Sequence, residues 1–199
     1  VSVKSSGKVE GKDVNSSISA STLTIEANEF KNLGIASAYD LNIKGSGANS
    51  KLTNLGNIEA LNLSISNLTN INNTGSIYGE DSLSISGINL TNSGSIFSPQ
   101  SYAISLTGLL SNSVIISSGI DLSITANQLD NSSEISAQNN LTFSITSSAN
   151  NSENLIAGKE LNFSADSLTN SGIIQSSEDS TFNLATLINS EDGKIYSGK

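Results

Sequence analysis

Hydrophobic residues recur along the chain as pairs separated by one polar residue. Such period-2 alternation is typical of a short β-strand that buries one face. Ser, Thr and Asn fill most positions between the pairs, and they are poor in helix interiors, so no helix is expected. The pairs are Leu23/Ile25, Leu41/Ile43, Leu63/Ile65, Leu83/Ile85, Ile104/Leu106, Leu122/Ile124, Leu141/Phe143, Leu161/Phe163 and Phe182/Leu184. The pattern predicts an all-β protein.

An asparagine recurs in step with these pairs. It stands at Asn32, Asn54, Asn73, Asn92, Asn112, Asn131, Asn151, Asn170 and Asn189, at spacings of 19 to 22 residues. A mostly apolar position precedes each asparagine by two residues, at Phe30, Leu52, Ile71, Leu90, Leu110, Leu129, Ala149, Leu168 and Leu187. Another apolar position follows it, at Ile35, Ile58, Ile77, Ile96, Ile116, Ile135, Leu155, Ile174 and Ile195. These sets of equivalent positions, which we call registers, share one period and therefore indicate a repeat architecture.

A unit of about 20 residues cannot bury its apolar side chains alone, but a stack of such units can. Each strand then pairs in parallel with the same strand of the next unit, about 4.8 Å away. The sequence therefore predicts a parallel β-helix, a solenoid of about nine to ten coils with 19–20 residues per coil.

The asparagine column has a structural explanation in such a stack. The same amide recurs at the same turn, so the side chains are expected to form a hydrogen-bonded ladder. Glycine follows two residues later in five coils, which predicts turns with positive φ. Val114 holds this place after Asn112, and valine is unfavourable at positive φ, so its turn is expected to differ from the turn at Gly94.

The start of the chain is less regular than the rest. Residues 3–9 resemble a coil with Ser5 in the asparagine place, and the long step from there to Asn32 predicts a loop around residues 10–20. Regular coils are expected over residues 21–199. We interpret residues 1–199 as one β-helical repeat region, and as a fragment of a longer chain because neither end carries a polar cap over its open strands.

The repeat resembles the haemagglutinin repeats of filamentous haemagglutinin-like exoproteins. The segments "INNTGSI" (71–77), "LTNSGSI" (90–96) and "LTNSGII" (168–174) carry the resemblance, which extends over residues 21–199. It implies a right-handed parallel β-helix in a large protein of Gram-negative bacteria, exported by two-partner secretion through an outer-membrane transporter. Members of that family are adhesins or effectors of contact-dependent growth inhibition, so the resemblance implies a secreted protein on the bacterial cell surface.

Charge narrows the range of partners. The net charge is −9, all nine basic residues are lysines, and no lysine lies between Lys51 and Lys159. Such a surface repels nucleic acid and anionic membranes, so neither is expected as a partner, and no segment is apolar enough to insert into a bilayer. His, Cys and Arg are absent. No cofactor, no metal site and no catalytic residue are therefore predicted, although parallel β-helices also include polysaccharide-active enzymes.

Aromatic residues supply the candidate partner-binding site. The residue after each core isoleucine should point outward by strand alternation. This places Tyr78 and Phe97 on the surface of adjacent coils, and Tyr102 follows closely. Exposed aromatic side chains are favoured anchors at interfaces, although an aromatic pair between coils also stabilises a sheet.

Two functional hypotheses follow. The first is a structural filament segment that presents adhesive or toxic domains away from the cell. The second is a binding module that recognises a receptor on a host or bacterial cell. A polysaccharide-active enzyme is a third alternative, and it would require convergent acids and a base in one groove.

Overall fold

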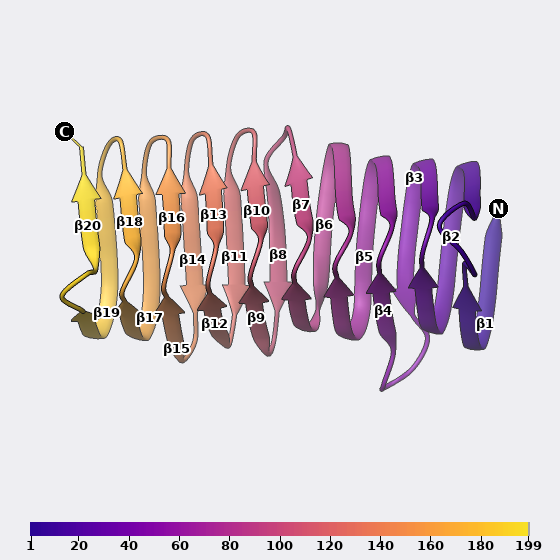
Figure 1. Ribbon diagram of the computed structural model, residues 1–199, viewed down its shortest axis with the longest axis horizontal. Coiled ribbons are helices and arrows are strands. Elements are labelled where there is room, and N and C mark those ends of the chain that lie inside the picture. Colours follow the sequence, from indigo (N-terminus) through magenta and orange to yellow (C-terminus); the bar gives the residue numbers. More distant parts are fainter. Residues whose placement is uncertain (199) are drawn as a thin grey trace.

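The computed structural model describes residues 1–198 as one elongated stack of parallel strands (Figure 1). The stack has about 10 turns of about 19 residues, with the N-terminus at one end and the C-terminus at the other. The predicted all-β parallel solenoid is confirmed. Its right-handed winding stays a prediction.

Twenty strands build the stack. They are β1 (Ser2–Glu10), β2 (Ser17–Asn32), β3 (Ile35–Gly45), β4 (Lys51–Asn54), β5 (Asn57–Asn73), β6 (Ser76–Asn92), β7 (Ser95–Ser98), β8 (Tyr102–Leu106), β9 (Leu109–Asn112), β10 (Ile115–Ser118), β11 (Leu122–Ala126), β12 (Gln128–Asn131), β13 (Glu134–Ala137), β14 (Leu141–Ile145), β15 (Ser148–Asn151), β16 (Asn154–Ala157), β17 (Leu161–Asn170), β18 (Ile173–Ser176), β19 (Ser180–Asn189) and β20 (Lys194–Ser197). Long strands such as β5 and β6 continue around corners, whereas the middle coils divide into three short strands each.

Each coil contributes one segment to each of three faces, which we call A, B and C and define by the strands of the middle coils. Face C contains β7, β10 and β13, face A contains β8, β11 and β14, and face B contains β9, β12 and β15. Every face pairs in parallel with the same face of the neighbouring coils. Inward residues of all three faces form one apolar core, which includes nearly all the residues of the predicted registers.

Three core registers differ from the prediction. In β8 the pair aligned with Leu83/Ile85 is Tyr102/Ile104, not Ile104/Leu106. The strand has three inward positions, and a period of two does not decide which pair matches the next coil. For the same reason β19 is shifted, so that Phe182 lies beside Phe163.

The third difference is at the first turn. Ile35 is an exposed residue, and its neighbour Ala36 is the one that aligns with Ile58 in the core. Alanine is a weak hydrophobic signal beside isoleucine, so the pattern selected the wrong residue of the two.

The irregular start is confirmed, with different details. The loop between β1 and β2 covers residues 11–16, inside the predicted range. Ser5 does not hold the asparagine place, because it pairs with Ala27, and the N–H of Gly11 donates to the carbonyl of Lys31 at 3.0 Å. A second insertion, between β3 and β4, accounts for the 22-residue step from Asn32 to Asn54.

The predicted reason for the turn glycines, a positive φ, is wrong. No glycine of the described chain has a positive φ. At the turns that have glycine, the coils approach closely: a Cβ on Gly75 would overlap the backbone carbonyl oxygen of Gly56 in the preceding coil. The turn at Val114 does differ, because the hydrogen bond from the Ile115 N–H to the Gly94 carbonyl lengthens to 3.4 Å.

Candidate functional site

The asparagine ladder is the most regular polar feature of the rod. Each Nδ2 donates to the Oδ1 of the asparagine in the next coil at 2.8–2.9 Å, through the eight steps from Asn32 to Asn189. In most coils the same amide also donates to the carbonyl two residues later, as Asn92 does to Gly94 at 3.0 Å. The predicted structural ladder is confirmed. Its inner members are buried, so they offer nothing to a partner.

The outward residues distinguish one face from the other two. Between the inward pairs, face A carries Thr24, Asn42, Ser64, Ser84, Ala103, Ser123, Thr142, Asn162 and Thr181. Face B carries Lys31, Thr53, Asn72, Thr91, Ser111, Asp130, Asn150, Thr169 and Ile188. Face C carries Ser37, Glu59, Tyr78, Phe97, Ser117, Ser136, Ile156, Gln175 and Tyr196. Large side chains thus gather on face C.

Tyr78 and Phe97 lie side by side on face C, as predicted. Their strands pair directly, the ring centroids are 5.9 Å apart, and the ring planes are inclined by 26°. Phe97 is exposed and Tyr78 is half-buried. The pair therefore offers an apolar surface to a partner while it also links two coils.

Tyr102 does not belong to this surface, and the prediction of an exposed residue there is wrong. Its side chain points inward and takes the place that Leu83 and Leu122 hold in the neighbouring coils. Only 6% of Tyr102 is exposed, and its hydroxyl has no hydrogen-bond partner among the described residues. Burial also raises the pKa of Tyr102 above the ordinary value of 10.0.

Replacing Tyr102 by phenylalanine is expected to stabilise the protein by about 1–2 kcal/mol, because an unpaired buried hydroxyl costs about that much. Urea unfolding measures the change. A second effect follows from the raised pKa of Tyr102: above pH ~10 the unfolded chain loses this proton first. The stability of the unsubstituted protein should therefore fall as the pH rises through that range, and Tyr102→Phe should remove this part of the loss. A lower urea midpoint for the variant would contradict the prediction.

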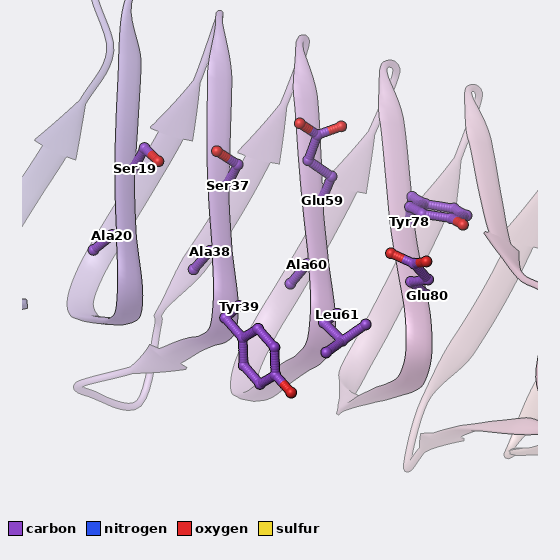
Figure 2. Close-up of a pocket in the computed structure, with 10 residues that line it drawn as sticks. All are labelled: Ser19, Ala20, Ser37, Ala38, Tyr39, Glu59, Ala60, Leu61, Tyr78 and Glu80. Atoms are coloured by element: carbon purple, nitrogen blue, oxygen red, sulfur yellow. The ribbon is translucent and has the colours of Figure 1, made fainter.

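A shallow groove crosses face C where the chain turns toward face A (Figure 2). Its volume is about 330 Å³. Small residues of adjacent coils, Ser37, Ala38 and Ala60 among them, lie along it, and Figure 2 shows the larger side chains around these. Those larger side chains are Tyr39, Glu59, Leu61, Tyr78 and Glu80, and we call the hollow that they line the face C groove.

A local irregularity shapes one end of this groove. Ala60 pairs with Gly79 and Asn62 with Ser82, so Leu61 faces two residues, Glu80 and Asp81. Such a β-bulge bends the strand and redirects its side chains. The Glu80 carboxylate lies beside Tyr78, next to the corner where Tyr39 and Leu61 stand in the two preceding coils (Figure 2).

Sequence analysis found Tyr78 but missed the corner residues of the groove. Tyr39 and Leu61 fall outside the apolar registers, since they lie at a bend between two faces. The only signal was the presence of two large side chains at equivalent positions, 22 residues apart in neighbouring coils.

The acidic residues of the groove lack a basic neighbour in the described structure. The ion pairs of residues 1–198 all lie near the N-terminal end, where Lys4, Lys8 and Lys31 contact glutamates. Glu59 and Glu80 are exposed and take part in none of them. The groove therefore combines aromatic surface with two carboxylates that have no counter-charge.

Residues 1–198 contain no cluster of three or more acidic side chains that could hold a metal ion. Within the same range no helix is long and apolar enough to cross a membrane.

Comparisons with known proteins identify no relative. No family model, no curated protein and no solved structure matches this chain. The fold and the outward side chains of face C are thus the basis for a functional proposal.

Proposed function

We propose that this solenoid is a structural segment of a long filament on the bacterial cell surface, where it holds adhesive or toxic domains away from the cell. The observation that carries the proposal is the buried asparagine ladder, which continues without a break from Asn32 to Asn189. A ladder of this kind ties every coil to the next and makes the rod stiff along its axis. Stiffness and uniform spacing are the properties that a spacer needs.

The resemblance to haemagglutinin repeats supports the location. In this proposal the chain is secreted by a Gram-negative cell through an outer-membrane two-partner-secretion transporter. Two faces covered mostly with short Ser, Thr and Asn side chains fit an extended surface that stays soluble and does not aggregate.

Face C favours a second candidate function, a receptor-binding module for a host or bacterial cell. A pure spacer has no need for a concentration of large outward side chains on one face. Tyr78 and Phe97, with Tyr39 nearby, are the type of exposed aromatic residue that anchors protein interfaces.

One experiment separates the two candidates. Fluorescently labelled protein is mixed with intact Gram-negative bacteria and with epithelial cells, and bound label is measured as a function of concentration. The spacer function predicts no saturable binding to any of these cells. The binding function predicts saturable binding. A Tyr78→Ser/Phe97→Ser double variant should then lower the affinity at least tenfold, since two aromatic anchors contribute roughly 2 kcal/mol or more at an interface. Saturable binding that the double variant keeps would show a recognition site elsewhere on the rod.

A further inference from the structure

We infer that the face C groove binds an extended basic segment of a partner protein, with lysine or arginine side chains placed between the aromatic rings and the carboxylates of Glu59 and Glu80. The inference rests on the binding function, the second candidate above, and it names the partner's chemistry. The filament function does not depend on it.

The groove has two parallel columns of outward residues. One column passes through Ser37, Glu59 and Tyr78 on successive coils, and the other passes through Tyr39 and Leu61 toward Glu80. Coils repeat at about 4.8 Å, so the four coils that line the groove span about 14 Å along the rod. This length matches about four residues of an extended peptide, which rises about 3.3 Å per residue.

The chemistry of the groove selects a cation. An ammonium or guanidinium group is attracted by the face of a tyrosine ring and by a nearby carboxylate. Figure 2 shows the Glu80 carboxylate next to the Tyr78 ring, with the Tyr39 ring near Leu61 at the corner. A cationic side chain placed in the groove therefore meets both kinds of group.

The charge of the whole rod supports the same partner. No lysine occurs between Lys51 and Lys159, and the carboxylates of Glu59 and Glu80 form no ion pair in residues 1–198. Lys31, Lys44 and Lys51 belong to the coils at the other end of the groove, but the net charge of −9 accelerates the approach of a basic segment to the rod and disfavours an acidic one. A neutral glycan would stack on the aromatic rings but would leave both carboxylates without a counter-charge.

The test uses an octapeptide of alternating lysine and serine, labelled with fluorescein, and the protein labelled with ¹⁵N. Fluorescence anisotropy measures the dissociation constant, and amide chemical shifts locate the bound peptide. We expect the changes in amide chemical shift on peptide binding to be concentrated at residues 37–39, 59–61 and 78–80. We also expect the dissociation constant to rise at least tenfold between 50 and 500 mM salt, because higher ionic strength screens the attraction.

Matched variants separate the groove from the general acidity of the rod. Glu59→Gln/Glu80→Gln and Glu153→Gln/Glu160→Gln each remove two exposed carboxylates. The first variant should raise the dissociation constant about tenfold, and the second less than twofold. Tyr78→Ser should weaken binding severalfold, whereas Tyr196→Ser, which removes an outward tyrosine at the far end of the same column, should not.

Several outcomes would overturn the inference. These are equal losses in the two glutamate variants, shifts spread along the acidic middle of the rod, or no binding at millimolar peptide. The inference would also be overturned, in favour of a glycan partner, if the neutral probe cellohexaose bound at the groove independently of salt and the lysine peptide did not bind there. The cell-binding experiment is independent of these results, so a failure here leaves the filament function to be judged by that measurement.

Discussion

Replacing Asn112 by aspartate is expected to lower the free energy of unfolding by about 3–5 kcal/mol at pH 7, because it places an unpaired charge in the buried ladder. Asn112 is 1% exposed. Its Nδ2 donates to Asn131 Oδ1 at 2.8 Å, to the Val114 carbonyl at 3.1 Å and to the Glu134 carbonyl at 3.2 Å. A carboxylate would present an oxygen to these three oxygens. Urea unfolding followed by circular dichroism measures the loss.

Two further variants establish the cause. Asn112→Ala removes the same donors without adding a charge, so it should cost less, about 2–3 kcal/mol. Asn70→Asp is the matched control, since Asn70 is exposed and its Oδ1 accepts a long 3.4 Å hydrogen bond from Asn89 that aspartate can keep. It should change stability by less than about 0.5 kcal/mol. Equal effects of the aspartate at positions 112 and 70 would show that the ladder contributes little.

Most of the fold was predictable because the same sequence pattern recurs in every coil of a solenoid. A single Leu-x-Ile pair is ambiguous, but such pairs at one period with an asparagine leave few alternatives to a stacked parallel sheet. The errors came where a coil offered two choices. Tyr102, Ile104 and Leu106 all point inward, and only pairing with the neighbouring coils, which the sequence does not state, selects the register.

The candidate site was predictable only in part, for a related reason. Tyr78 and Phe97 lie in the middle of a face, where strand alternation gives the direction of a side chain. Tyr39 and Leu61 lie at a corner, where alternation ends and the backbone bends. A bulge at Glu80 then determines what stands beside them, and no periodic pattern predicts a bulge.

The same repetition is compatible with both proposed functions in one rod. The inward positions set the stacking and leave little freedom for change, whereas the outward positions are nearly independent of the fold. A spacer can therefore acquire a binding groove through a few outward residues, such as Tyr39, Glu59 and Glu80, without any change in its core. The outward side chains on faces A and B are small with few exceptions, such as Lys31 and Ile188, and they show the background from which face C departs.

Replacing Phe163 by alanine is expected to cost about 3–5 kcal/mol, since it leaves a cavity in the centre of an aromatic stack. Phe163 is 2% exposed, and its ring centroid lies 4.8 Å from that of Phe143 and 6.4 Å from that of Phe182. Phe97→Ala is the control, because Phe97 is an exposed residue that stacks with Tyr78 alone, so its loss should be about 1 kcal/mol. Urea unfolding compares the two.

The location of the damage is as informative as its size. In a quasi-one-dimensional stack each coil contacts only its neighbours, so a weakened coil releases the shorter end of the rod first. Hydrogen exchange of Phe163→Ala should therefore show lost protection in β17, β18, β19 and β20, while β5 and β6 keep the protection of the unsubstituted protein. A uniform loss along the whole rod would instead mean that the coils unfold as one unit.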